Sequence, residues 1–126
     1  MIIERIQGDF TVCKVADVTS INLSSPYCFI GKTDEEISLV CRAEDVPADW
    51  TVREDGWRMM RIRGVLEFQE IGILARIAAL LAESNISILA VSTFNTDYIL
   101  VKAENEMNAL RKLAAGGYEI PAEDLL

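Results

Sequence analysis

The sequence predicts an α+β domain in its second half, with strands and helices in the order β-α-β-β-α-β. Three observations lead to this prediction. Two segments repeat apolar residues with helical spacing, the segments around them are short and strand-like, and asparagine or glycine follows each helical segment. The chain has 126 residues, of which 51% are hydrophobic, and this is enough to bury a core.

The first three elements occupy residues 57–94. Residues 57–64 form an apolar run in which arginines alternate outward, as is typical of a strand. Residues 86–94 are so continuously apolar that we expect a strand buried on both faces or lying centrally in its sheet. Between them, residues 72–84 are expected to form a helix that Asn85 ends. Its apolar stripe contains Ile73, Leu74, Ile77, Leu80 and Leu81.

The remaining elements follow a turn of hairpin length at residues 95–97. Residues 98–103 are the expected return strand. Asn105 is expected to cap a second helix that ends before Gly116, where two glycines adjoin. Residues 118–120 are the expected last strand, and the whole order is the ferredoxin-like arrangement. The inward face of the second helix is expected to contain Met107, Leu110, Leu113 and Ala114.

The N-terminal half repeats part of this pattern. Arg-Ala-Glu-Asp at residues 42–45 resembles Lys-Ala-Glu-Asn at residues 102–105. The segment between its first two strands leaves little room for a helix. We therefore expect a degenerate half over residues 1–55 and a complete domain over residues 56–126, with the strand from Trp57 closing the first and opening the second. The expected elements are strands at residues 10–15, 27–32 and 37–42 and a short helical stretch at residues 44–50.

Charge and hydropathy exclude several classes of function. Twenty acidic residues against 12 basic ones give a net charge of −8, which argues against binding to nucleic acids or anionic membranes. No apolar stretch approaches the 18 or so residues that a membrane span needs. The N-terminus does not have the pattern of a signal peptide. We expect a cytoplasmic protein.

The side chains of common catalytic and metal centres are scarce. The sequence contains no histidine, so the commonest general base and the commonest metal ligand are missing. The sequence contains three cysteines, Cys13, Cys28 and Cys41. This is an odd number, and their spacing matches no metal motif. We expect them to be buried apolar residues in a reducing compartment, with a reactive thiol as the alternative. We expect no catalytic residue, cofactor or metal.

Short motifs distributed over residues 56–117 carry a family resemblance. They are Gly56-Trp57, Gly64, Gly72-Ile73-Leu74, Ile86-Ser87-Ile88, Ser92-Thr93-Phe94 and Asp97-Tyr98-Ile99-Leu100-Val101. As a set they resemble the ACT domain family, and the whole chain resembles small bacterial proteins with tandem ACT-like halves. Those are similar to aspartate kinase regulatory domains and cytosolic arginine sensors. The resemblance implies an amino acid held between two ACT units, at the loop after the first strand, the first helix start and the turn after the second strand.

The residues at those places suit an amino-acid zwitterion. A helix start near Gly72 supplies free N–H groups for a carboxylate, and glycine permits close approach. Acidic side chains accept hydrogen bonds from an ammonium, Thr93 adds a hydroxyl and Phe94 an apolar wall. By resemblance, Asp97 occupies the position at which arginine sensors place a ligand-contacting acid. The candidate ligand-binding residues are Glu67, Phe68, Glu70, Ile71, Gly72, Ile73, Leu74, Thr93, Phe94 and Asp97.

Each candidate also has a purely structural interpretation. Gly72 can simply begin a helix, Asp97 can form a turn, the glutamates can be solvated, and Thr93 and Phe94 can be strand and core residues. The predicted function is a non-catalytic amino-acid sensor or regulatory module. It acts through an unidentified regulated protein and forms a homodimer. The acidic residues mildly favour a cationic amino acid. A structural interaction module without a pocket and a small enzyme stay as alternatives.

Overall fold

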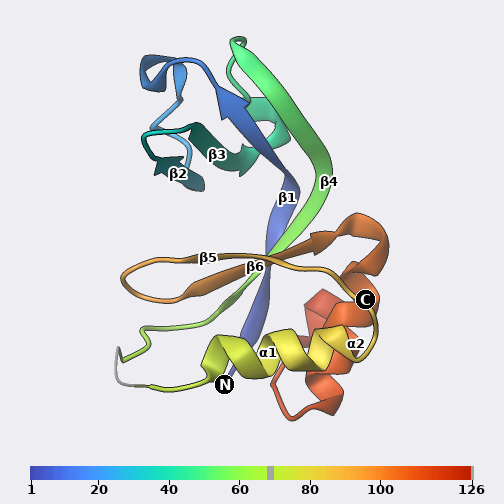
Figure 1. Ribbon diagram of the computed structural model, residues 1–126. Helices are drawn as coiled ribbons and strands as arrows, with labels where there is room; N and C mark the ends of the chain where they lie inside the picture. Colours follow the sequence, from blue (N-terminus) through green and yellow to red (C-terminus); the bar gives the residue numbers. More distant parts are fainter. Residues whose placement is uncertain (68–69, 126) are drawn as a thin grey trace. The chain divides into compact units, whose positions relative to one another are not determined.

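The computed structural model describes residues 1–67 and 70–125, which form two compact units (Figure 1). Unit 1 consists of Met1–Gln7 and Arg58–Leu126, and unit 2 of Gly8–Trp57. Two long strands, β1 (Ile3–Val15) and β4 (Trp50–Ile62), contribute residues to both units. Both begin seven residues before the expected strand starts at residues 10 and 57. None of the described helices is long and apolar enough to cross a membrane.

Unit 1 has the predicted α+β order. Its strands lie in the order β1-β4-β6-β5, and both of its α-helices lie on the same face of that sheet (Figure 1). The hairpin strands pair in antiparallel register, with Leu89 opposite Leu100. The bounds of the elements that follow β4 are α1 (Ile73–Ala82), β5 (Leu89–Ser92), β6 (Asp97–Lys102) and α2 (Glu106–Ala115).

The prediction of a closing strand at residues 118–120 is wrong. That segment makes only an isolated parallel bridge, between Glu119 and Ile2. The sheet position beside β4 belongs instead to residues 3–7 of β1, where Ile3 and Ile6 are buried. Pro121 follows so soon that the C-terminal segment is too short for a ladder of hydrogen bonds.

The expected position of β5 is also wrong, because β5 is an edge strand that pairs only with β6 among the described strands. Leu89 and Val91 are half-buried, whereas Ala90 and Ser92 face solvent. The continuous apolar pattern depended on Ala90, whose small side chain stays exposed at little cost. Ile86 is buried directly after the helix, before the strand begins. The strand is therefore four residues long.

The ends of both helices follow from residues with positive φ. Asn85 has φ 57°, and the Ile86 N–H donates to the Leu81 carbonyl oxygen at 3.0 Å. Gly117 has φ 103°, and the Tyr118 N–H donates to the Leu113 carbonyl oxygen at 3.1 Å. Both ends are therefore Schellman motifs, which satisfy carbonyl groups that the helix leaves unpaired. The predicted stops are confirmed.

Asn105 precedes α2 as expected, but its side chain makes no capping hydrogen bond. Its backbone is nearly helical, with φ −101° and ψ −4°, because a 3₁₀ turn over Ala103–Asn105 leads into the helix. The carbonyl oxygen of Ala103 accepts from the Glu106 N–H, so the turn itself supplies a partner at the helix start. Inside the helix, Ala109 is fully buried, while Met107 and Ala114 are only half-buried.

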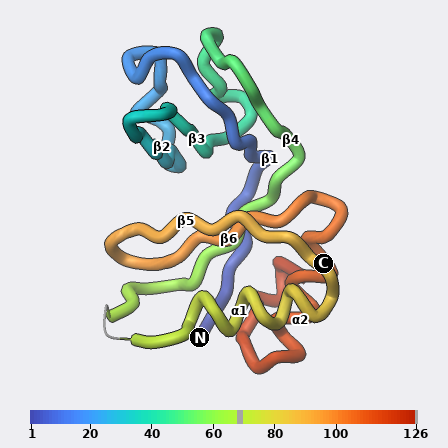
Figure 2. Tube along the Cα trace, in the orientation of Figure 1, coloured from blue at the N-terminus to red at the C-terminus, as the bar shows by residue number. Residues whose placement is uncertain are grey.

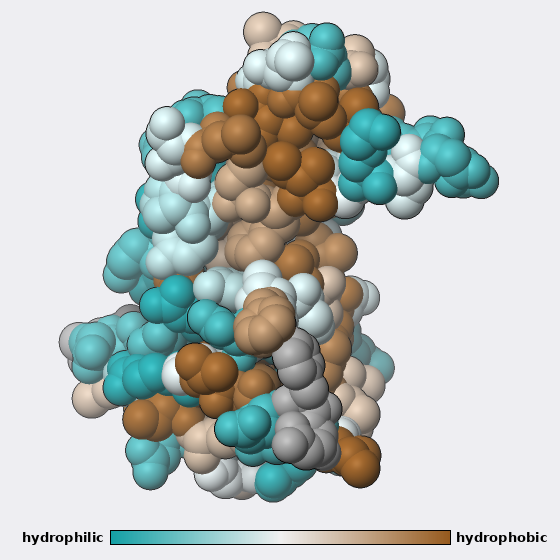
Figure 3. All heavy atoms as spheres, turned by 90° about the vertical axis from the view of Figure 1, so that its left-hand side faces the viewer, coloured by the Kyte–Doolittle hydropathy of each residue, from teal (hydrophilic) through white to brown (hydrophobic). Residues whose placement is uncertain are grey.

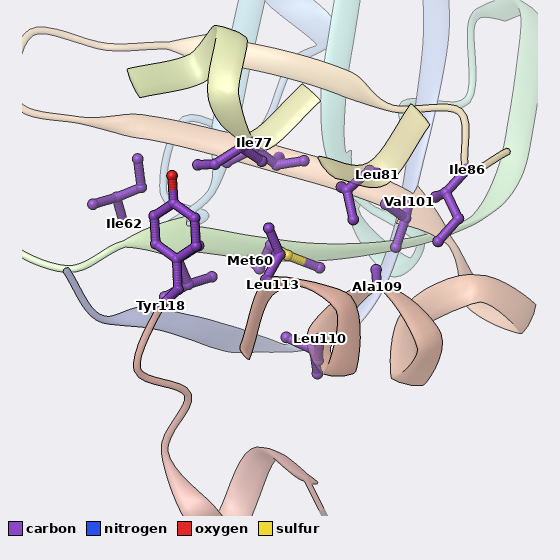
Figure 4. Close-up of a cluster of buried hydrophobic side chains, with 12 residues drawn as sticks. Met60, Ile62, Ile77, Leu81, Ile86, Val101, Ala109, Leu110, Leu113 and Tyr118 are labelled. Atoms are coloured by element: carbon purple, nitrogen blue, oxygen red, sulfur yellow. The ribbon is translucent and has the colours of Figure 1, made fainter. Parts of the chain in front are cut away.

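The core of unit 1 lies between the sheet and the two helices (Figure 4). Ile77 and Leu81 of α1 meet Leu110 and Leu113 of α2, and all four are fully buried. Met60 of β4 packs into the same cluster. Since α1 contributes its apolar stripe to this core, burial fixes the position of the helix and of its N-terminus.

Unit 2 has the strand order β2-β3-β1-β4, with β2 spanning Cys28–Lys32 and β3 spanning Ile37–Arg42. The described residues of this unit contain no α-helix. Short 3₁₀ turns, Val18–Ser20 and Ala43–Asp45, stand in place of helices. Of the expected helical stretch at residues 44–50, only residues 44–45 are helical, in the second 3₁₀ turn. Pro47 lacks an N–H, and β4 begins at Trp50.

The hairpins of the two units match in detail. The Thr33 N–H donates to the Glu36 carbonyl oxygen at 2.9 Å, as the Thr93 N–H does to the Thr96 carbonyl oxygen at 2.9 Å. The strands β3 and β6 share one pattern of burial. The last residue of each of these two strands, Arg42 in β3 and Lys102 in β6, has φ −63°. That the two units are separate domains with a boundary at residue 55 stays a prediction.

The three thiols lie in the apolar cluster of unit 2, and we expect them to react slowly. Cys28 lies opposite Cys41 in the sheet. Burial raises the pKa of the Cys41 thiol to about 12 and also raises the pKa of Cys13 and Cys28. Because the thiolate is the nucleophile, a native thiol titration with Ellman's reagent at pH 8 should be slow, with half-buried Cys28 reacting first. Rapid reaction in guanidinium is the control, and a rapid native reaction at Cys13 or Cys41 would contradict this account.

Candidate functional site

A cleft of about 400 Å³ lies within unit 1, in the size range of small-molecule sites. Three segments form it: the loop after β4, the N-terminus of α1 and the turn between β5 and β6. The course of α1 and of the hairpin β5–β6 can be followed in Figure 2. The residues that line it are Leu66, Glu67, Glu70, Gly72, Ile73, Leu74, Ala75, Ser92, Thr93, Phe94, Asn95, Thr96 and Asp97.

Of the candidate ligand residues that the structure describes, all except Ile71 line this cleft. Ile71 is 96% exposed and lies outside the cleft lining. Phe68 lies outside the described residues. Ser92 was missed by the sequence analysis, although it lies directly opposite Asp97 in the hairpin register. A hairpin aligned on its turn would have indicated that pairing.

Hydrogen bonds tie the loop to the hairpin. The Leu66 N–H donates to the Asn95 carbonyl oxygen at 2.7 Å. The hydroxyl of Thr96, which is 7% exposed, donates to the Ile62 carbonyl oxygen at 2.8 Å. These bonds hold the end of β4 and the start of the loop against the turn, so segments about thirty residues apart in the sequence meet at one place.

The start of α1 offers hydrogen-bond donors to the cleft. Gly72 is the N-cap residue and has φ 77°, a left-handed conformation that glycine adopts without strain. The first hydrogen bond of the helix runs from the Arg76 N–H to the Gly72 carbonyl oxygen at 2.9 Å. The N–H groups of residues 73–75 therefore have no acceptor within the helix. Together with the helix dipole, they favour a negatively charged group at this end.

The turn between β5 and β6 uses its hydroxyl groups in two ways. The Thr93 hydroxyl donates to the Thr96 carbonyl oxygen at 3.0 Å, so its proton is committed to the turn. The Ser92 hydroxyl donates to Asp97 Oδ1 at 2.6 Å. Phe94 is 78% exposed at this turn and lines the cleft as an apolar wall, not as a core residue.

The cleft combines acidic lining residues, of which Glu67 and Glu70 are exposed to solvent, with apolar neighbours. Glu67, Glu70 and Asp97 contribute carboxylates, and none of the described lining residues is lysine or arginine. Large apolar side chains are exposed nearby at Val65 and Ile71. Figure 3 shows the side toward which the hairpin points, where hydrophilic and hydrophobic residues adjoin in this part of unit 1. Such a cleft can hold a carboxylate at the helix start and a cation at the acids.

An ion cluster supports the end of β4, just before the loop. Glu4 accepts hydrogen bonds from Arg61 Nε and Arg63 Nε, each at 2.8 Å. The hydrogen bond from Arg61 is the main cause that lowers the pKa of Glu4 below its ordinary value of 4.5. A carboxyl with a lowered folded-state pKa stabilises the fold above its unfolded pKa, and this stability is lost as the pH falls through the folded pKa.

We therefore expect Glu4→Gln to lower the free energy of unfolding at pH 7 by about 1 kcal/mol, since the arginines are partly solvated. The difference from wild type should shrink as the pH falls below about 4.5, which urea titrations between pH 7 and pH 3 measure. Asp55→Asn removes the partner of Arg53 at a more exposed position and serves as the control. A pH-independent difference for Glu4→Gln would contradict the assignment.

Comparisons with known proteins find a family model and curated relatives that match part of this chain. Residues 52–115 match the sequence model of the ACT domain. The chain is 44% identical over 72 residues to "Cytosolic arginine sensor for mTORC1 subunit 1" of Homo sapiens, covering 52% of this chain and 22% of that protein. For the Rattus norvegicus protein the identity is 37% over 94 residues, covering 69% and 28%. The chain thus spans about a quarter of the length of the curated relatives it matches.

Solved structures share the fold over nearly the whole chain. A protein of Agobacterium tumefaciens superposes with a TM-score of 0.81 at 26% identity, covering 94% of this chain and 90% of that one. The ligand-free regulatory subunit of aspartate kinase from Thermus thermophilus superposes with a TM-score of 0.63 at 12% identity, covering 93% and 98%. At 12% identity, the similarity to the Thermus thermophilus structure shows a shared fold only.

Proposed function

Because the chain belongs to the ACT domain family, we propose that it is a non-catalytic regulatory module that binds a free amino acid in the cleft of unit 1. One observation carries this proposal: the unpaired N–H groups at the start of α1 and three carboxylates line the same cleft. These are the donors and acceptors that a zwitterion requires, and they lie on separate segments that the fold brings together.

The ligand carboxylate lies at the N–H groups of Ile73, Leu74 and Ala75 in this proposal. Gly72 has no side chain to obstruct the approach of that carboxylate. The acids at Glu67, Glu70 and Asp97 then face the ammonium and the ligand side chain. Three acids without a basic neighbour in the lining favour a cationic side chain, and the name of the curated relatives, arginine sensors, points to the same class.

Regulation requires a second conformation or a partner, because binding alone transmits nothing. We propose a homodimer and, in addition, a regulated protein that responds to the ligand. The free edge of β5 and the exposed Ile71 and Phe94 favour association with a second copy. Sedimentation velocity with and without L-arginine measures the state, and a monomer throughout the micromolar range would contradict the dimer.

A catalytic role has little support among the residues. The sequence has no histidine, and burial raises the pKa of every thiol. The proposed location is the cytoplasm, in keeping with the word cytosolic in the names of the curated relatives.

A thermal-shift measurement on the full chain with each of the twenty amino acids tests the proposed function. A ligand at 100 times its Kd stabilises the native state by about 2.7 kcal/mol. We expect L-arginine or L-lysine to raise the Tm. Agmatine, which lacks the α-carboxylate of arginine, is the matched control and should raise it much less. A folded protein whose Tm responds to none of the twenty would contradict the proposal and favour a structural interaction module.

A further inference from the structure

We propose that Ser92 is a specificity-determining residue of the cleft. Its hydroxyl proton is committed to Asp97, so the two side chains present only hydrogen-bond acceptors to a ligand. Such a pair selects a ligand side chain that brings two or more N–H donors, as a guanidinium or an ammonium does. This inference rests on the proposed function and names the part of the ligand that the pair recognises.

The geometry of the pair is set by the sheet. Ser92 is the last residue of β5, Asp97 is the first of β6, and the two lie directly opposite each other. Ser92 Oγ lies 2.6 Å from Asp97 Oδ1, a distance typical of a hydroxyl that donates to a carboxylate. Both residues line the cleft. The pair is therefore held by backbone pairing and does not depend on a mobile side chain alone.

The chemistry follows from a count of protons. A serine hydroxyl has one proton and two lone pairs, and an ionised carboxylate has lone pairs only. While the Ser92 hydroxyl donates its hydrogen bond to Asp97, every remaining site on the two side chains is an acceptor. The neighbouring Thr93 hydroxyl does not supply a donor to the ligand, because it donates its hydrogen bond to the Thr96 carbonyl oxygen. A ligand group that offers only lone pairs, such as a carboxylate or a urea oxygen, cannot form hydrogen bonds with the acceptor atoms of Ser92 and Asp97. The binding of such a group at this place is therefore disfavoured.

The hairpin of unit 2 provides an internal comparison. Its corresponding pair, Lys32 opposite Ile37, contains neither the hydroxyl nor the carboxylate. Nevertheless the hairpin has the same strand pairing, and the Thr33 N–H donates to the Glu36 carbonyl oxygen as in unit 1. Since this hairpin forms without such a pair, folding does not explain the presence of Ser92 and Asp97 at the cleft.

Isothermal titration of the full chain with L-arginine and L-citrulline tests the inference. Citrulline has the shape of arginine, but a urea oxygen replaces one guanidinium nitrogen. We expect Ser92→Ala to weaken arginine binding about five- to tenfold and to reduce the ratio of arginine to citrulline affinity. Ser92→Thr should restore both values. Ser38→Ala removes another serine that donates to a carboxylate, that of Glu36, away from the cleft, and should change neither.

The outcomes separate this inference from the proposed function. If Ser92→Ala weakens both ligands equally or neither, Ser92 does not determine specificity, and the inference is overturned while amino-acid binding stands. Wild type that binds only amino acids with neutral side chains overturns it in the same way. Wild type that binds none of the twenty overturns both. The Tm of the Ser92→Ala variant should stay within about 2 °C of wild type, which separates lost recognition from lost folding.

Discussion

Replacing Leu110 with alanine is expected to lower the free energy of unfolding of unit 1 by about 2–5 kcal/mol. Leu110 is fully buried in the cluster between α2 and the sheet, and Figure 4 shows it among the core side chains. The substitution removes apolar contacts and leaves a cavity that a close-packed core fills only in part. Both described α-helices belong to unit 1, so circular dichroism at 222 nm in urea reports its unfolding.

Leu23→Ala is the matched control for Leu110→Ala. Leu23 is 74% exposed and lies in unit 2, so the same change of side chain should alter the stability by less than about 0.5 kcal/mol. A Leu110→Ala variant that stays within 1 kcal/mol of wild type would show that the core does not have the packing described here, and that α1 is not fixed by it.

Asp97→Asn is expected to weaken L-arginine binding by at least about tenfold, because it removes one of the three negative charges of the cleft. Loss of a charge-assisted hydrogen bond costs about 1.5–3 kcal/mol, and each 1.4 kcal/mol is tenfold in Kd. Asparagine has the same shape and can still accept a hydrogen bond from Ser92. The stability should therefore stay near that of wild type. Isothermal titration at low and high salt measures the effect, which should decrease as salt screens the charge.

Glu119→Gln removes an exposed acid of unit 1 that does not line the cleft, and it should bind L-arginine as wild type does. If Asp97→Asn and Glu119→Gln lose affinity equally, the loss is caused by the change in the net charge of −8 and not by a contact in the cleft. If Asp97→Asn retains the full affinity, Asp97 is a turn residue without a role in binding.

The features that were predictable from the sequence are local ones. The stripe that contains Ile77 and Leu81 locates α1, and Asn85 ends it, because helical periodicity and a left-handed residue are determined by near neighbours. The hairpin turn is local in the same sense. The strand at residues 3–7 was not predicted, because its place beside β4 depends on pairing between segments far apart in the sequence. Such pairing leaves no local pattern by which it could be recognised.

The residues of the candidate site also divide into those that could be predicted from the sequence and those that could not. Gly72 and Asp97 were predicted because the family resemblance indicates a helix start and a hairpin turn as ligand contacts, and both features can be located from the sequence; both residues line the cleft. The hydrogen bond from Ser92 to Asp97 was missed, because a contact between two side chains depends on the register of the strands. The exposure of Ile71 could not be predicted from the sequence either. It lies in a loop without a periodic pattern, and the path of such a loop is fixed by tertiary contacts.

A ¹H–¹⁵N NMR titration of the full chain with L-arginine examines most directly whether the start of α1 and the turn before β6 hold one ligand together. The largest changes in amide shift should fall on residues 73–75 and on Thr96 and Asp97, and they should saturate with a single Kd. Changes confined to residues of unit 2, or no changes at millimolar arginine, would contradict the account.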